Sequence, residues 1–425
     1  MSEDFPRGGS LKAKAETRPP CPGGARYSSR GQRPISVNLR LTGRVVSATL
    51  RGMRPPHHEN LEVENWTLLC TFLPPCWEEM ARRTGALRRA RGVPDASSLL
   101  RLLLLHVAQG WSLAETSVHA RHLGWDVSPV AVFKRLQASE EWLRWLAEQE
   151  RGRQRPVLES QGRPVRAVDG TSVSEPGSTG TDWRVHYAIN LANLQCDFFE
   201  LTAVEKGGET LRRVPVQAGD IMMGDRVYAT PVGVAHVTEA HGDVVVRLNR
   251  QSLPLFDGDG NRLSLLPLFQ KLPAGQPQEW TARVRHPAGG WIAGRLIATR
   301  RSAQATRLAR LRLERRASRK QRQVSREAWK AAAYFAVWTS LPETFTALAT
   351  LELYRLRWQI EVAFKRMKSI LGLGHLPKKD PASARAWLHG KLFVSLLVER
   401  MVDAAQAFSP WGYRLDAATQ SGEGN

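Results

Sequence analysis

The sequence is short of acidic residues and of long apolar runs. Against 61 lysines and arginines it has 40 aspartates and glutamates, which gives a formal net charge of +21. Such a charge favours a polyanionic partner, of which nucleic acid is the usual example and an anionic membrane surface the alternative. The best apolar run, Leu99–Leu105, is short and interrupted by Arg101, so it predicts a buried helix rather than a membrane span. The first residues also lack the apolar core of a signal peptide.

Cysteine is scarce as well. No two of the four cysteines lie at the spacing of a metal-binding pair, and no histidine pair has zinc-finger spacing. This pattern argues against a zinc site and against a disulfide framework, and it favours a reducing compartment.

Composition divides the 425 residues into several stretches. Residues 1–60 are rich in Gly, Pro, Ser and Arg and predict a disordered basic tail. We interpret residues 1–52 as lying upstream of a true start at Met53, in preference to an arm that touches DNA. Residues 61–155 predict a helical domain, residues 251–330 a β-rich insertion with a basic helix, and residues 411–425 a loose tail.

Helix-start residues punctuate the helical stretch. Asp95 is placed to cap a helix over residues 96–109, Ser112 a helix over 113–122, and Ser128 a helix over 130–137. Two short helices joined by a tight turn fit a helix-turn-helix, in which Lys134 and Arg135 would meet DNA. An ordinary helical bundle explains the same pattern about as well.

From residue 163 the pattern changes to strands. Three strands over 163–171, 185–191 and 196–204 precede a strand at 221–225, a helix at 230–240 and a strand at 244–248. This order predicts a mixed sheet with helices on both faces, hence an α/β fold. We place Asp169 and Asp225 at the carboxyl ends of strands, where open α/β sheets hold their chemistry. Turn formation beside a glycine is the structural alternative, and the rival acids are Asp182, Asp220 and Asp243.

Two later stretches carry the remaining polar signals. Residues 300–330 predict one long helix whose density of positive charge favours contact with phosphates. Residues 354–371 predict another helix with an apolar stripe and a narrow polar strip beside it. Taken alone, this strip is more typical of a solvated face with paired charges. Its members are Tyr354, Arg357, Glu361, Lys365 and Lys368.

Asp169, Asp225 and Glu361 suggest a common site. Three converging carboxylates repel one another unless cations lie between them, and Mg²⁺ prefers oxygen ligands. Two such ions about 4 Å apart can activate a water and stabilise a leaving oxygen, as phosphodiester cleavage requires. Nearby bases, Arg226 and Lys365 among them, would hold the DNA backbone.

At this point the sequence resembles a known family. Tyr354, Arg357, Glu361 and Lys368, separated by two, three and six residues, match the signature of IS4-family bacterial insertion-sequence transposases. The segments Gly224-Asp225-Arg226-x-Tyr228 and Val168-Asp169-Gly170-Thr171 resemble the two aspartate motifs of that family. The resemblance covers roughly residues 60–405, most of the chain.

The resemblance implies an RNase H-like catalytic core, over residues 156–250 and 331–410, and DDE chemistry. Asp169, Asp225 and Glu361 would bind two Mg²⁺ ions, which Mn²⁺ can replace, while Tyr354, Arg357 and Lys368 would hold phosphates. It further implies cleavage at inverted-repeat ends, strand transfer into target DNA, a homodimer on paired ends and a cytoplasmic, nucleoid-associated bacterial protein. A hairpin step would need aromatic residues such as Trp280 or Trp291, for which a core role is favoured.

Two other functions stay open at this point. The first is a catalytically inactive DNA-binding regulator, or a decayed transposase copy, which the intact set of three acids argues against. The second is a metal-dependent nuclease without strand transfer, which the sequence does not separate from a transposase.

Overall fold

The computed structural model describes residues 58–152, 156–158, 161–178, 180, 182–374 and 376–407. From Glu62 onward these residues belong to one compact unit. The predictions for residues 1–57 and for the tail at 411–425 lie outside the described residues. Within the described part, no helix is long and apolar enough to cross a membrane.

Six helices form the first part of this unit, and three of them begin at the predicted caps. The Asp95 carboxylate accepts a hydrogen bond from the Ser98 amide, and Ser112 forms a reciprocal capping box with Glu115. Ser128 caps the helix that opens with proline. The helices are α1 (His58–Thr71), α2 (Trp77–Arg83), α3 (Ala96–Val107), α4 (Leu113–His122), α5 (Pro129–Ala138) and α6 (Glu140–Glu150).

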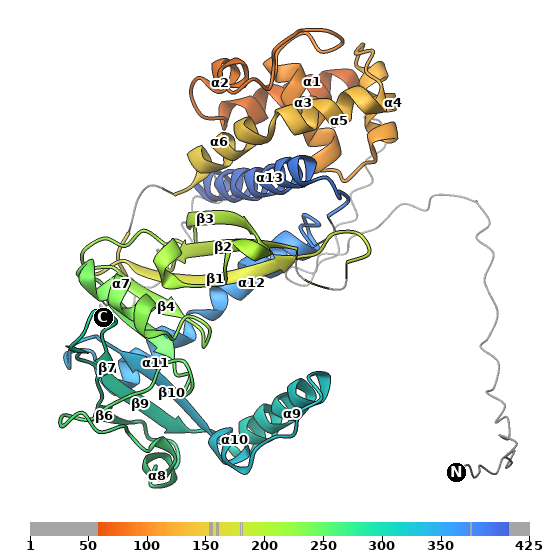
Figure 1. Ribbon diagram of the computed structural model, residues 1–425. Helices are drawn as coiled ribbons and strands as arrows, with labels where there is room; N and C mark the ends of the chain where they lie inside the picture. The colour runs from red at the N-terminus through yellow and green to blue at the C-terminus, as the bar shows by residue number, and fades with distance from the viewer. Residues whose placement is uncertain are drawn as a thin grey trace, which may run out of the picture. The chain divides into compact units, whose positions relative to one another are not determined.

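An eight-stranded mixed sheet follows, in the order β3-β2-β1-β4-β5-β10-β9-β6 (Figure 1). The first three strands form an antiparallel meander, and β1, β4 and β5 are parallel. The predicted mixed sheet is therefore confirmed. The strands of this half are β1 (Val165–Val173), β2 (Trp183–Asn190), β3 (Cys196–Ala203), β4 (Ile221–Gly224) and β5 (Asp243–Arg247), with short helices η1 (Val204–Lys206) and η2 (Leu211–Arg213) after β3 and helix α7 (Pro231–Glu239) between β4 and β5.

The predicted insertion contributes strands to the same sheet. Strand β10 pairs antiparallel with both β5 and β9, and β9 pairs with β6, so hydrogen bonding is continuous across the insertion. Only β7 and β8 form a separate two-stranded ribbon among the described strands. The elements are α8 (Leu265–Gln270), β6 (Gln278–Thr281), β7 (Val284–Arg285), β8 (Trp291–Ile292), β9 (Arg295–Arg300) and β10 (Tyr334–Thr339).

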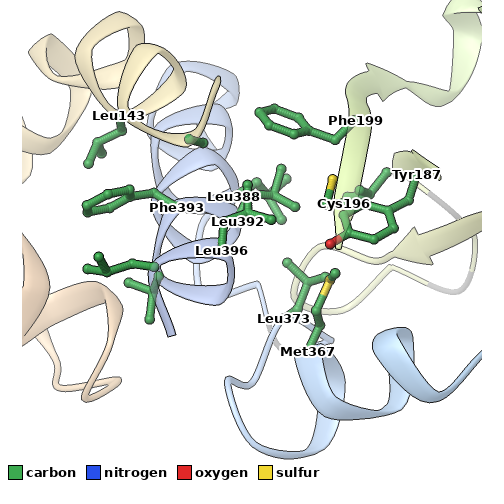
Figure 2. Packing of buried hydrophobic residues seen from close by; sticks show 14 of the residues in the cluster. Leu143, Tyr187, Cys196, Phe199, Met367, Leu373, Leu388, Leu392, Phe393 and Leu396 are labelled. Atoms are coloured by element: carbon green, nitrogen blue, oxygen red, sulfur yellow. The ribbon is translucent and has the colours of Figure 1, made fainter. Parts of the chain in front are cut away.

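Helix α13 (Pro381–Ala407) joins the helical part to the sheet. Figure 2 shows Phe393 of α13 beside Leu143 of α6, while Leu388 and Leu392 point toward Phe199 of β3. All five side chains are buried. This helix packs against both the sheet and the helical part, and its most extensive packing is with α6.

The basic stretch is not one helix, as the sequence predicted, but two. Helix α9 (Ala303–Arg319) ends where Gln321 adopts a left-handed backbone with φ 49°, and Ser325 caps α10 (Arg326–Ala331). The Arg322 amide bonds back to the Ala317 carbonyl, which satisfies the end of α9.

The stretch over 354–371 is also broken, into α11 (Ala347–Arg355) and α12 (Trp358–Ser369). Between them the Leu356, Arg357 and Ile360 amides each bond to the carbonyl three residues earlier instead of four. This tighter hydrogen bonding interrupts the α-helix at Leu356 and Arg357. The residues of the predicted polar strip therefore lie on two helices.

Candidate active site

The three predicted acids come from three elements that meet at one edge of the parallel strands. Asp225 directly follows β4, and Glu361 lies in the first turn of α12. The prediction that Asp169 lies at a strand end is wrong. Asp169 lies in the middle of β1, because β1 continues to Val173 as the antiparallel partner of β2. The last parallel pair joins Ala167 and Met223, so both aspartates come two residues after it.

Arg357 connects two of these acids. Its Nη1 lies 3.3 Å from Asp169 Oδ2, and its Nη2 donates a hydrogen bond to Glu361 Oε1. The Arg357 and Asp169 side chains are 14% and 19% exposed, whereas Glu361 is 59% exposed. Asp169 and Glu361, 192 residues apart in sequence (361 − 169), are thus separated by one guanidinium group.

The electrostatics at Asp169 favour a bound cation. Burial raises the pKa of Asp169 to about 6, and the negative charges of Asp225 and Glu209 add to this effect. The hydrogen bond from the Gly170 amide and the Arg357 charge act in the opposite direction. A carboxyl group crowded by other acids gains when a divalent cation binds among them.

The donor set fits a hard divalent cation, although the described side chains include no group of three acids, histidines or cysteines already arranged as a metal site. All the candidate ligands are carboxylate oxygens, the type that Mg²⁺ and Mn²⁺ prefer. The Arg357 guanidinium contacts both Asp169 and Glu361, so it takes up the space between them.

Glu209 is a fourth acid at this site, which the sequence analysis missed. A Cβ atom added to Gly170 would lie 2.7 Å from Glu209 Oε1, so the carboxylate rests directly against the residue that follows Asp169. Arg184 of β2 pairs with Glu209 at 3.3 Å. Glu209 precedes the short helix η2 in a loop without any periodic pattern, so its position could be found only from the fold.

The two glycines beside the aspartates allow close packing. At Gly224 an added Cβ would lie 2.6 Å from Tyr228 Cβ, which explains why glycine precedes Asp225. The Tyr228 hydroxyl is buried without a hydrogen-bond partner, and burial together with the charges of the nearby acids raises its pKa. It is a donor without an acceptor beside the acidic site.

Tyr354, in the last turn of α11, is buried rather than exposed on the polar strip. Its hydroxyl donates a hydrogen bond of 3.2 Å to the Gly224 carbonyl. Burial raises its pKa to about 12. Tyr354 therefore ties the end of α11 to the strand end that carries Asp225.

The predicted DNA-binding bases differ in exposure. Lys365 is exposed, whereas Lys368 donates to the Ser172 carbonyl at 3.2 Å. On α5, Lys134 is exposed, whereas Arg135 donates to the backbone carbonyls of Arg89 and Arg91 in the chain before α3.

Arg226, next to Asp225, belongs to an arginine cluster. Desolvation lowers the pKa of Arg226 to about 10, and the charges of the other arginines add to this effect. The members besides Arg226 are Arg247, Arg250, Arg301 and Arg316. Of these, Arg247 and Arg301 lie over the Phe335 ring, which in turn packs against Tyr354 at 5.6 Å between ring centroids.

The rival aspartates have structural partners. Asp182 accepts hydrogen bonds from the Glu175 amide and the Ser178 hydroxyl, and Asp243 binds Arg163 at 2.8 Å. Asp220 is buried against Arg166. These contacts give each of the three rival acids a structural role.

The two tryptophans of the insertion, for which a core role was predicted, differ in how far they are buried. Trp280 is half-buried and packs against Phe269, with 6.5 Å between the ring centroids. Trp291 is 42% exposed and rests on Phe256, so the core prediction is wrong for Trp291.

Comparison with known proteins agrees with this geometry. The family described as "Transposase DDE domain" matches residues 160–397, more than half of the chain. The chain belongs to this DDE transposase family. It is 32% identical over 361 residues to the protein of Escherichia coli named as transposase InsL for insertion sequence element IS186A, a match covering 83% of this chain and 97% of that protein. The match to the Escherichia coli transposase for insertion sequence element IS421 is also 32% identical, over 362 residues, with the same coverage.

Family membership confirms two predictions from the sequence. The resemblance to insertion-sequence transposases is confirmed, and the sheet β3-β2-β1-β4-β5 is the RNase H-like core of this DDE transposase. The matched region begins before β1 and ends within α13, so it contains all three predicted acids.

Proposed function

We propose that this DDE transposase cuts DNA at the inverted-repeat ends of an insertion sequence and joins the freed ends to target DNA. Two observations support the proposal: Arg357 contacts both Asp169 of β1 and Glu361 of α12, and the charge of Asp225, at the end of β4, acts on Asp169. The intact set of acids favours this function over that of an inactive DNA-binding regulator.

The three acids would hold divalent cations, with Mg²⁺ as the physiological ion and Mn²⁺ as a substitute. The bound ions would lower the pKa of the attacking water and stabilise the leaving oxygen. Glu209 would keep Arg184 beside the site and Tyr354 would hold the Asp225 strand end, so both are positioning residues.

Arg357 has two incompatible partners in this proposal. Its guanidinium group contacts Asp169 and Glu361 in the DNA-free protein, but a phosphate of the DNA end would compete for the same donors. Transfer of Arg357 to the phosphate would free the two carboxylates for the cations. Metal binding and DNA binding would then support each other.

Helix α9 supplies a broad surface for DNA. None of its 17 residues is buried, although an isolated helix of this length is only marginally stable in water. A groove of about 860 Å³ runs beside it, lined by four arginines and by Trp329, over which Arg310 lies at 4.7 Å. We assign this surface to the DNA backbone, and the arginine cluster around Arg226 continues it toward the acids.

The test uses linear DNA that carries the ends of the element, in Mg²⁺. We expect Glu361→Gln to bind this DNA with unchanged affinity and to lose cleavage by at least about 10³-fold, because one metal-binding carboxylate is removed. Glu352→Gln, an exposed acid on α11, is the matched control and should cleave normally. Cleavage at the wild-type rate in Glu361→Gln would refute the assignment.

The same assay separates the alternatives. Joined products support a transposase, nicks without joining support a nuclease, and binding without cleavage supports a regulator. We further propose a homodimer on paired ends and a cytoplasmic, nucleoid-associated location, as the resemblance implies. Cross-linking on paired-end DNA would test the dimer.

A further inference from the structure

Three basic side chains are buried together outside the acidic site. His106 lies at the end of α3, Lys378 in the link between α12 and α13, and Lys391 on α13. Their side chains are only 3%, 7% and 4% exposed. Charged groups are rarely buried to this degree unless an opposite charge accompanies them.

Packing brings these residues to one place. A Cβ added to Gly390 would lie 3.0 Å from Val107, so α13 at this level packs against the end of α3 that carries His106. A Cβ added to Gly372, in the link before α13, would lie 3.8 Å from Lys391 Nζ. The charges of Lys378 and Lys391 both act on His106.

No described acid neutralises this cluster. Burial lowers the pKa of Lys378 and lowers that of Lys391 to about 8, and no carboxylate opposes either change. Lys391 Nζ lies over the Trp387 ring at 5.0 Å. His106 Nδ1 lies 2.6 Å from the Trp111 carbonyl oxygen, while His106 Nε2 is buried without a hydrogen-bond partner.

We propose that His106, Lys378 and Lys391 form a binding site for a phosphate group. A phosphate would neutralise the two ammonium groups and offer its oxygens to their donors. It would also let the imidazole take up a proton and donate through Nε2. The three residues come from three segments, so the site exists only in the folded chain.

The source of the phosphate is either the DNA backbone or free phosphate in solution. The DNA source rests on the proposed function. It is supported by the position of the link, because a Cβ at Gly374 would lie 3.8 Å from the Lys368 side chain on the catalytic helix. Lys368 comes seven positions after Glu361, which is about 10 Å along α12.

The first arm of the test measures the thermal midpoint of the full chain in sodium phosphate and in sodium chloride of equal ionic strength. We expect phosphate to raise the midpoint of the wild type by about 5 °C when the site is saturated. Lys379→Gln, an exposed neighbouring lysine, is the matched control and should keep this rise. Lys391→Met and Lys378→Gln should lose it.

Lys391→Met separates binding from packing, because methionine retains an apolar stem of similar length. A variant that folds with an unchanged midpoint in chloride but no longer responds to phosphate supports the site. The proposal would be overturned if phosphate raised the midpoint equally in the wild type and in both site variants. It would also be overturned if phosphate had no effect on the wild type and Lys391→Met left the salt slope of DNA binding unchanged.

The second arm measures the binding of duplex DNA against salt concentration. If the site holds a backbone phosphate, the slope of log affinity against log salt should fall by about 0.9 in Lys391→Met. A phosphate response in the first arm with an unchanged slope identifies free phosphate as the ligand. Failure of the wild type to bind DNA at all would instead refute the proposed function, while the first arm would still test the site.

Discussion

Replacing Arg357 by glutamine should strengthen the binding of divalent metal to the DNA-free protein. The guanidinium group lies between Asp169 and Glu361, and both acids are proposed metal ligands. Glutamine keeps hydrogen-bonding capacity but carries no charge. Removing the competing cation should therefore favour the metal, although the same substitution removes a phosphate contact and should weaken binding of the DNA ends.

The size of the effect follows from the geometry. A charge pair at 3.3 Å attracts with about 5 kcal/mol at an effective dielectric constant of about 20. Partial solvation of Asp169 and the exposure of Glu361 reduce this to roughly 1–3 kcal/mol. Such a coupling corresponds to about 5- to 150-fold in affinity.

The assay is calorimetric titration of Mn²⁺ into the DNA-free protein. We expect Arg357→Gln to bind Mn²⁺ about 10-fold more tightly than the wild type. Arg355→Gln removes an exposed arginine two residues earlier and serves as the charge-matched control. Equal Mn²⁺ affinity in Arg357→Gln and Arg355→Gln, or weaker binding in the former, would refute the reasoning.

Three further predictions concern pH, stability and salt. Because the pKa of Asp169 is raised to about 6 from its usual 3.8, the carboxyl group binds a proton more tightly in the folded state than in the unfolded state. The stability gained from this proton is present at low pH and is lost as pH rises from about 4 to 6. Since the proton and the metal compete for the same carboxylate, Mn²⁺ binding should weaken as pH falls below about 6. Affinity that stays constant from pH 7 to pH 5 would contradict this. Arg166→Met removes the guanidinium group shared by the buried carboxylates of Asp197 and Asp220 and should destabilise the protein by about 3–5 kcal/mol in urea unfolding, whereas Arg213→Met, in a more exposed pair, should cost about 0–1 kcal/mol. Neutralising three exposed arginines of α9 should lower the salt slope of DNA binding by up to about 2.7, and an unchanged slope would remove α9 from the interface.

Local chemistry explains what could be predicted from the sequence. Helix starts depend on one side chain and the next few amides, so Asp95, Ser112 and Ser128 identified them correctly. The buried strands β4 and β5 are short apolar runs bounded by turn residues. Such runs predict strands, so the order of β4 and β5 and the position of Asp225 at the end of β4 could be predicted.

Long-range contacts explain what could not be predicted. The hydrogen bonds to the carbonyl three residues earlier, which separate α11 from α12, do not alter the spacing of the apolar residues. The sequence pattern therefore predicted one continuous helix with Tyr354 on an exposed face, whereas Tyr354 is buried. Glu209 reaches the site from an irregular loop, and only the folded chain shows it against Gly170. The pairing of β9 with β10, which makes the insertion part of the sheet, depends on segments more than 30 residues apart.

The break between α11 and α12 limits how much the spacing of the signature residues can vary. Tyr354 precedes the break between α11 and α12 and is anchored to Gly224, while Arg357 directly precedes the helix that presents Glu361. One extra residue after Arg357 would turn the Glu361 carboxylate by about 100° around the helix axis and shift it by about 1.5 Å. The acid would then point away from Asp169 although every side chain of the signature was still present. The number of residues between these positions therefore determines the direction in which each side chain points. Insertions or deletions there should abolish activity as completely as loss of an acid.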